Sequence, residues 1–305
     1  MQIPITENFV QIDCADSRKQ IQGPIIAAST DRNLEVWGTA FLIAEGWAMT
    51  AKHVVKDYLK CIGGIDFSKG RTINAGFSFP IHLYVSDTTG QPVVFGVTRI
   101  YYNEITDIAL LRLKIQEEKK WESLGEFRAL QLLPPEVGAT VSIVGCPRSF
   151  LGHTENDLRE IHTFPRLSTG VVRDVHEMRR DRNLHFPCFL TSARLLGRMS
   201  GSPIFNDDGC ICGVAVYSME QDESHEPISY GATLWPIAGI QCDGEPPTAN
   251  GVATFYDVMH RGQVKAIDLN QVLVAMHQGK RSVTNLKIAA QMGRTPSGNV
   301  SYDLS

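Results

Sequence analysis

The feature that most constrains the fold is a series of short apolar runs separated by Gly, Asp, Asn and Pro. Runs of about four to eight residues rich in Val, Ile, Phe and Thr are typical of β-strands and not of alternating helices and strands. In the first half the runs are Ile25–Ala28, Glu35–Ile43, Trp47–Thr50, Ile73–Phe77, Ile81–Val85, Val93–Ile100 and Ile108–Leu113. In the second half they are Gly138–Pro147, Ser168–Val172, Phe186–Leu190, Cys210–Tyr217 and Ile228–Pro236. The series predicts an all-β protein, a barrel or sandwich, made of two consecutive units.

Changes in composition divide the chain. The charged segment Gln116–Glu122 interrupts the strands and is typical of a linker. Near the end, Thr254–Met259 and Asp268–His277 have helical character, the second with Asp268 as candidate N-cap. We therefore expect an N-terminal extension (1–22), a first β-barrel (23–120), a second β-barrel (121–242) and a C-terminal helical segment with a tail (243–305).

Composition and charge exclude several function classes. The 305 residues are 43% hydrophobic and 20% charged, with a net charge of -4, as in an ordinary soluble globular protein. Nothing in this balance predicts nucleic acid or a membrane surface as a partner, and the short basic stretch Arg173–Arg182 is expected to be an exposed loop. The N-terminus has no export-signal pattern, and no apolar run reaches the ~18 residues that span a bilayer. We expect a cytoplasmic protein.

The seven cysteines do not form a recognisable framework. They are Cys14, Cys61, Cys146, Cys188, Cys210, Cys212 and Cys242. An odd, scattered set argues against secreted disulfides, and the paired spacings of a zinc site are absent. We expect reduced, mostly buried thiols, and neither a metal nor another cofactor.

Three residues together suggest nucleophilic catalysis. Ser200 lies in Gly197–Pro203, where a serine is followed by glycine, a small residue and proline at the entry to a strand. A serine hydroxyl needs a base and a carboxylate that orients the base. His53 ends an apolar hairpin at the edge of the first unit, and Asp107 opens the apolar strand that starts at Ile108. Taken alone, such a histidine is more often structural and such an acid a turn residue.

The order of the three residues is more specific than any one of them. His, Asp, Ser is the order of the chymotrypsin arrangement and of neither the subtilisin nor the α/β-hydrolase arrangement. His53 and Asp107 fall in the first unit and Ser200 in the second, so a site would form in the cleft between the units.

With these residues in place, the chain resembles the trypsin/chymotrypsin-like serine protease family, in particular bacterial intracellular members and the protease domain of high-temperature-requirement proteases. The resemblance covers roughly residues 24 to 240. The matching segments are Gly38–Phe41, Thr50–His53, Asp107–Leu111, Gly138–Pro147, Ser168–Val172, Thr191–Ala193 and Ser200–Pro203. It implies two six-stranded antiparallel β-barrels and peptide-bond hydrolysis without a cofactor.

The resemblance also implies roles for individual residues. Ser200 would be the nucleophile, His53 the general base and then acid, and Asp107 the group that fixes the His53 tautomer. The backbone N–H groups of Arg198 and Ser200 would form the oxyanion hole. The strand edge that pairs with an extended substrate would be Val216, Tyr217 and Ser218.

The specificity pocket can be interpreted in two ways. Arg194 falls near the floor of the pocket and would favour acidic side chains. The acidic loop near the rim would have the opposite effect; its residues are Glu220, Asp222, Glu223 and Glu226. Both sets are also compatible with ordinary solvated charges.

Three residues of the nucleophile segment deserve separate consideration. Arg198 stands where the family has glycine, in a backbone conformation that costs other residues about 1–3 kcal/mol, so we expect an oxyanion hole that is collapsed at rest. Met199 replaces the aspartate that captures a newly cut N-terminus, so activation by such a cut is not expected. Ser202 is an alternative nucleophile, two residues away from the family position.

Three hypotheses follow. The first is an active serine endopeptidase acting on a protein or peptide substrate. The second is a catalytically silent, protease-like module that binds peptides or regulates. The third is a conditional protease that is latent until an activating protein partner orders the oxyanion hole.

Overall fold

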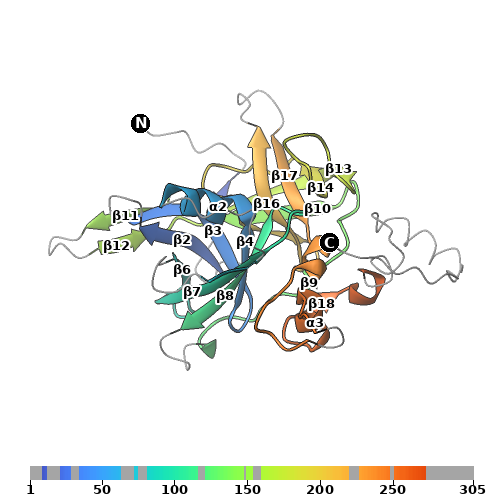
Figure 1. The fold of residues 1–305 in the computed structure, drawn as a ribbon. Coiled ribbons are helices and arrows are strands. Elements are labelled where there is room, and N and C mark those ends of the chain that lie inside the picture. The colour runs from blue at the N-terminus through green and yellow to red at the C-terminus, as the bar shows by residue number, and fades with distance from the viewer. Residues whose placement is uncertain are drawn as a thin grey trace, which may run out of the picture.

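The computed structural model describes residues 9–11, 21–28, 34–62, 72–74, 81–115, 121–147, 149–153, 159–219, 227–247 and 251–272. Strands dominate this part of the chain, and they form two bodies that lie side by side (Figure 1). The linker residues 116–120, the strand residues 75–77 and the acidic residues 220–226 lie outside the described residues.

The first body is a closed antiparallel barrel of six strands. Its strands are β2 (Gln22–Ala28), β3 (Leu34–Ala44), β4 (Trp47–Ala51), β6 (Ile81–Ser86), β7 (Pro92–Tyr102) and β8 (Ile108–Ile115). The ring runs β2-β3-β4-β8-β7-β6 and closes where β6 pairs with β2. A seventh strand, β5 (Thr72–Asn74), is added to β7 outside the ring. Helix α2 (Lys52–Cys61) follows β4 directly.

The second body is a second closed ring of six antiparallel strands. They are β10 (Thr140–Gly145), β13 (Arg166–His176), β14 (Cys188–Thr191), β15 (Pro203–Asn206), β16 (Ile211–Met219) and β17 (Ile228–Thr233). The ring runs β10-β13-β14-β17-β16-β15 and closes where β15 pairs with β10. The two-barrel architecture expected from the sequence is therefore confirmed.

Short elements surround the second ring. They are β1 (Val10–Gln11) on β13, β9 (Leu130–Gln131) on β16, β18 (Ala266–Ile267) on β9, the hairpin β11 (Phe150–His153) and β12 (Arg159–His162), the 3-10 helix η2 (Trp235–Gly239) and helix α3 (Phe255–His260). Because β1 pairs with β13, part of the N-terminal extension belongs to the sheet of the second barrel. The hairpin extends to one side of the molecule, where β11 lies beside β3 (Figure 1).

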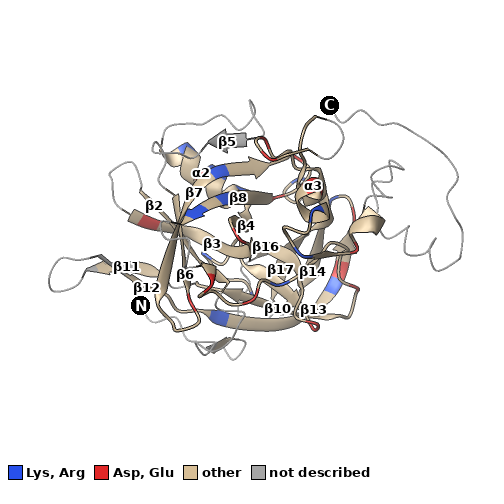
Figure 2. Cartoon of the chain, turned by 90° about the horizontal axis from the view of Figure 1, so that it is seen from below, with Lys and Arg blue, Asp and Glu red and all other residues tan. Residues whose placement is uncertain are grey.

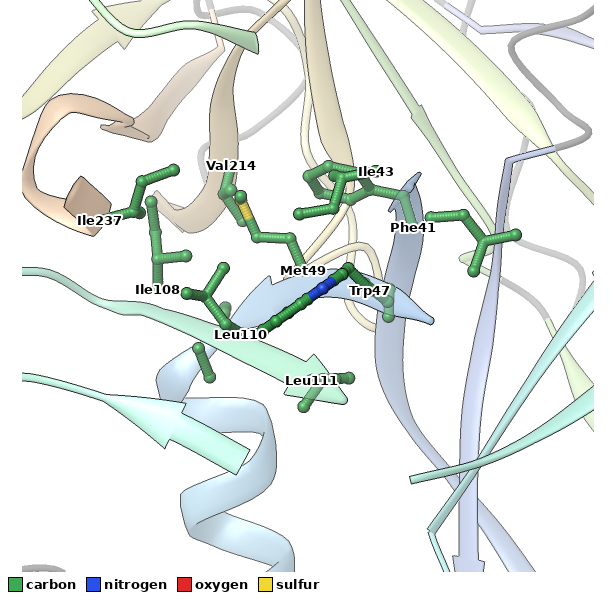
Figure 3. Packing of buried hydrophobic residues seen from close by; sticks show 14 of the residues in the cluster. Phe41, Ile43, Trp47, Met49, Ile108, Leu110, Leu111, Val214 and Ile237 are labelled. Atoms are coloured by element: carbon green, nitrogen blue, oxygen red, sulfur yellow. The ribbon is translucent and has the colours of Figure 1, made fainter. Parts of the chain in front are cut away.

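The hydrophobic core is continuous between the two barrels. One cluster of buried side chains contains Phe41, Trp47 and Leu110 of the first barrel together with Val214 of β16 and Ile237 of η2 (Figure 3). These apolar contacts fix how the barrels sit against each other. The position of any site between them is therefore set by the core.

The charges are mixed in sign. Figure 2 shows Lys and Arg as well as Asp and Glu on elements of both barrels. No helix within the described ranges combines the length and the apolar composition that crossing a bilayer requires.

The structure corrects several details of the sequence interpretation. His53 is the second residue of helix α2 and not the end of a hairpin strand. The hairpin of β11 and β12 was not expected, because its two four-residue strands are too short to show an apolar pattern. The basic stretch begins inside strand β13, and only its later part, from Met178, is an exposed turn.

The C-terminal helices are described in part. The helix expected at Thr254–Met259 is confirmed as α3, whose start is fixed by Asp257 Oδ2 accepting from Thr254 N at 2.7 Å. Residues 269–272 are helical, and the Asp268 carbonyl accepts from Val272 N at 3.2 Å, as expected at a helix start. The remainder of that predicted helix, 273–277, lies outside the described residues.

Candidate active site

Asp107 and His53 form a close pair at the edge of the first barrel. His53 Nδ1 lies 2.6 Å from Asp107 Oδ2, so an ionised Asp107 accepts the Nδ1 proton. The His53 side chain is 34% exposed and that of Asp107 13% exposed. The pair thus leaves Nε2 as the unprotonated nitrogen of the neutral ring, available to an outside group.

Asp107 also caps the helix that carries His53. The residue before α2 is Ala51, which has no side chain that can accept a hydrogen bond from the helix start. Asp107 takes this role from a distant part of the chain. Its backbone carbonyl accepts from Lys52 N at 2.8 Å, and its Oδ1 accepts from His53 N at 3.0 Å. The carboxylate therefore fixes both the His53 ring and the helix on which the ring is mounted.

The surroundings of His53 favour its protonated form. Burial opposes a charge on the ring, but the hydrogen bond to Asp107 and the negative charges of Asp107 and Asp57 outweigh it, so the pKa of His53 is raised above its usual value. Asp57 lies one helical turn after His53 on α2. This raised pKa is the direction expected of a base that must hold a proton during a reaction.

A turn stabilised by Asn103 precedes Asp107. Asn103 Oδ1 accepts from Ile105 N at 3.1 Å and from Thr106 N at 3.2 Å, which closes the turn immediately before Asp107. Lys52 Nζ donates to the Asn103 carbonyl at 2.8 Å from the start of α2. The sequence analysis did not single out Asn103, although an Asn in a polar turn before a strand is a typical signal for such a closure.

Ser200 lies in the loop between β14 and β15, and this loop is attached to the first barrel. Thr39 N on β3 donates to the Ser200 carbonyl at 2.9 Å. Gly201 N donates to the Ala215 carbonyl at 2.7 Å, and Gly201 has a φ of 89°, in the region that favours glycine. A Cβ on Gly201 would lie 2.0 Å from the Thr39 carbonyl oxygen. Only glycine therefore permits this approach of the two barrels.

The backbone of Ser200 lies near the start of the helix that carries His53. A Cβ on Gly38 would lie 2.8 Å from the Val54 side chain, next to His53, and 3.0 Å from the Ser200 carbonyl. Among the hydrogen bonds of the described residues there is none between Ser200 Oγ and His53 Nε2. In proteases without a bound substrate such hydrogen bonds are often long or poorly aligned.

Ser202 and Met199, which flank Ser200 in the same loop, are buried. Ser202 is 0% exposed, and the added Cβ of a residue in place of Gly145 would meet its Oγ at 2.3 Å. Ser200 is partly exposed, whereas Ser202 is shielded from solvent. Met199 is also 0% exposed, and its sulfur accepts from Leu196 N at 3.5 Å, so it fills the position with an uncharged group.

The backbone before Ser200 forms a tight turn with an unusual residue. Met199 N donates to the Leu196 carbonyl at 3.1 Å, and Arg198, the third residue of this turn, has a φ of 70°. This matches a type II turn, which normally has glycine there. In the described part of the chain, the N–H groups of Arg198 and Ser200 donate to no protein acceptor. Both are available to an oxygen atom of a ligand.

Two contacts hold Arg198. Thr39 Oγ1 donates to the Arg198 carbonyl at 2.9 Å, and Arg198 Nη1 donates to the Ser149 carbonyl at 2.8 Å. Neither contact can be predicted from the sequence, because a backbone carbonyl can accept a hydrogen bond whatever the residue type.

The predicted substrate-binding residues form a strand edge. Up to Val214, β16 pairs with β15 on one side. Val216, at a bulge, and Tyr217 and Ser218 beyond it have no strand partner on that side within the described residues. Tyr217 is 36% exposed and Val216 only 4%. This edge has the free backbone groups that an extended peptide requires.

Arg194 lies in the same loop as Ser200. Its N donates to Ser168 Oγ at 2.7 Å, which holds the backbone, and its Nε is buried without a hydrogen-bond partner in the described structure. The opposing acidic residues lie in 220–226, outside the described residues.

The described cysteines are free, and most of them are buried. Six are described, all are free, and four of them are buried: Cys146, Cys188, Cys212 and Cys242. Cys14 lies outside the described residues. Within those residues, no group of three or more His, Cys, Asp or Glu side chains is arranged to hold a metal ion.

A fold of two β-barrels with a His–Asp pair and a serine loop between them defines a class of peptidases. The profile of the trypsin-like peptidase domain matches residues 38–214, more than half of the chain, and the chain belongs to this family. No curated protein matches it.

Several solved structures are similar to this chain at low sequence identity. Deg5 covers 72% of this chain and 86% of its own length at 14% identity, with a TM-score of 0.48. Neuropsin, a serine protease expressed in the limbic system of mouse brain, covers 74% and 93% at 13% identity, with a TM-score of 0.47. The active form of the Rv3671c protease from M. tuberculosis covers 76% and 88% at 14% identity, with a TM-score of 0.41.

Proposed function

We propose that this protein is a serine endopeptidase that cleaves peptide bonds through Ser200, His53 and Asp107. The observation that carries the proposal is the 2.6 Å contact between His53 Nδ1 and Asp107 Oδ2. His53 belongs to helix α2, whose start lies against the Ser200 loop. A binding module has no need of a carboxylate that both orients a histidine and raises its pKa.

The proposed reaction begins with attack of Ser200 Oγ on the carbonyl carbon of the scissile bond. His53 Nε2 takes the Ser200 proton, and the N–H groups of Arg198 and Ser200 hold the oxyanion. The proton then passes from His53 to the leaving amine, the C–N bond breaks, and an acyl-enzyme remains on Ser200. Water, deprotonated by His53, hydrolyses the ester and restores Ser200.

The substrate is proposed to bind as an added strand. The free edge at Val216, Tyr217 and Ser218 would pair with the residues that precede the scissile bond. Arg194, whose buried Nε has no partner among the described residues, would favour an acidic side chain in the specificity pocket. We further propose a cytoplasmic, reducing location, in line with the free thiols.

An organophosphonate probe tests the proposal, because it forms a covalent bond with an activated serine. We expect wild-type protein to be labelled at Ser200, as located by peptide mapping, and Ser200→Ala to be unlabelled. Ser202→Ala is the matched control and should keep the label. Labelling at a different serine in the wild-type protein would refute the assignment.

The silent peptide-binding module is the second candidate, favoured by the missing hydrogen bond between Ser200 and His53 in the described structure. It predicts that wild type binds a peptide in fluorescence anisotropy but shows neither labelling nor hydrolysis. A protease that is latent without a partner predicts labelling in cell lysate and none after purification.

A further inference from the structure

At Arg198 the intrinsic preference of the backbone opposes the observed conformation. Its φ of 70° is disfavoured for every residue except glycine. A type I turn keeps the same hydrogen bond from Met199 N to the Leu196 carbonyl but gives the third residue a negative φ, which suits arginine. The two turns differ by rotation of the peptide between Gly197 and Arg198. That rotation turns the Arg198 N–H away from the side it shares with Ser200.

The Arg198 side chain supplies a contact that glycine cannot make. Its guanidinium donates to the carbonyl of Ser149, a residue that is 0% exposed. Hydrogen bonds from a charged donor are stronger than neutral ones. Ser149 is itself tied to the barrel, since its N–H donates to the Cys146 carbonyl at 3.4 Å at the end of β10. The acceptor is thus a buried residue in the connection after β10, held to the end of that strand.

From these contacts we infer that the Arg198 side chain, through its hydrogen bond to the Ser149 carbonyl, keeps the oxyanion hole formed. We call this side chain the latch. The inference rests on the proposed peptidase function. The guanidinium bond to Ser149 offsets the backbone preference for the rotated turn, so that Arg198 acts as a positioning residue through its side chain and as an oxyanion donor through its N–H. The anchor of the oxyanion hole is the hydrogen bond from the Arg198 guanidinium to the Ser149 carbonyl. With this bond the hole is formed at rest, and without it the hole collapses.

Two substitutions of Arg198 separate the latch from the backbone. Arg198→Leu removes the anchor but keeps a Cβ and its backbone preference, so kcat should fall about tenfold or more while KM changes little. Arg198→Gly removes the anchor and the preference together, so its kcat should stay at least about threefold above that of Arg198→Leu. Arg179→Leu removes an exposed arginine elsewhere and is the charge control.

Two kinetic outcomes overturn the latch. Equal kcat in wild type and Arg198→Leu means that the anchor does not support the oxyanion hole. An equal loss in Arg198→Gly and Arg198→Leu means that the guanidinium acts on the substrate directly. Circular dichroism melting verifies that the variants are folded before the rates are compared.

Crystal structures of the two variants test the inference without any activity. We expect a negative φ at position 198 in Arg198→Leu and a positive φ in Arg198→Gly. A positive φ in Arg198→Leu refutes the latch, even if wild type is silent. Conversely, absence of hydrolysis and labelling in wild type refutes the peptidase proposal and leaves the structural comparison to decide on the latch.

Discussion

At the scale of single residues, Asp107 is the most connected group of the site. Its Oδ2 holds the His53 ring, its Oδ1 accepts from the His53 backbone, and its carbonyl accepts from Lys52 N. A negative charge at the start of a helix is also favoured by the helix dipole. Orientation of the base and stability of α2 therefore depend on one carboxylate.

Asp107→Asn should separate the charge of this residue from its shape. The amide can still accept from the His53 backbone, but it does not stabilise a protonated ring and favours the wrong tautomer, so we expect kcat to fall on the order of 10³-fold or more. Steady-state kinetics with a peptide substrate measures the effect. Asp207→Asn, an exposed residue after β15, should leave kcat unchanged.

At the scale of elements, helix α2 explains a limit of the sequence analysis. Its residues follow β4 without a capping side chain, because the acceptors come from Asp107, 54 positions later. No local signal marks such a helix start. The same limit applies to Thr39 and Arg198, which are joined across 159 positions through a backbone carbonyl. The prediction of His53, Asp107 and Ser200 as a catalytic set rests instead on their residue types and their order along the chain.

Helix α2 also sets the pH dependence of the proposed reaction. Catalysis needs neutral His53, so kcat/KM should rise with pH as the ring loses its proton, with a midpoint above the usual pKa of histidine. Asp57→Asn removes a charge that stabilises the protonated ring, so the pKa of His53 falls and the acid limb moves to lower pH. A pH–rate profile measures the shift. An unchanged limb, with Asp207→Asn as control, would contradict the contribution of Asp57.

Two glycines that follow Ser200 in the sequence should differ in how much stability is lost when they receive a side chain. Gly201 and Gly209 both have positive φ, but only a Cβ on Gly201 meets other atoms, whereas nothing lies within 4 Å of one on Gly209. Gly209→Ala should cost about 1–2 kcal/mol of unfolding free energy from the backbone alone. Gly201→Ala adds the overlap with Thr39 and should cost roughly 2–5 kcal/mol. Urea denaturation compares the two, and equal losses would show that the barrels separate easily here.

At the scale of the whole molecule, most of the strand content followed from the sequence. The runs around Phe41, Leu83 and Val144 became barrel strands because their apolar residues, many of them β-branched or aromatic, are buried in the core. The hairpin of β11 and β12 was missed, since Phe150 is exposed and stacks on His162 with ring centroids 4.7 Å apart. That contact leaves no apolar period in the sequence.

Burial in the core should determine which cysteine thiols react with an alkylating reagent. Burial raises the pKa of the Cys188 and Cys212 thiols to about 12, and that of Cys242 is also raised. Iodoacetamide should therefore modify exposed Cys61 of the native protein at neutral pH much faster than these three. Peptide mapping by mass spectrometry measures the rates. Urea should make all four equally reactive, and fast labelling of Cys188 without urea would indicate that the second barrel opens.

The bonds from Thr39 to Arg198 and Ser200 have a consequence for the synthesis of the chain. A ribosome releases His53 and Asp107 well before the loop that carries Ser200, and that loop is bonded to β3 of the first barrel through Thr39. If the proposed peptidase function holds, the growing polypeptide has no complete Ser200–His53–Asp107 site while strands of the second barrel are still being synthesised. The order of the three residues along the chain would thus prevent cleavage of the chain by its own active site during synthesis.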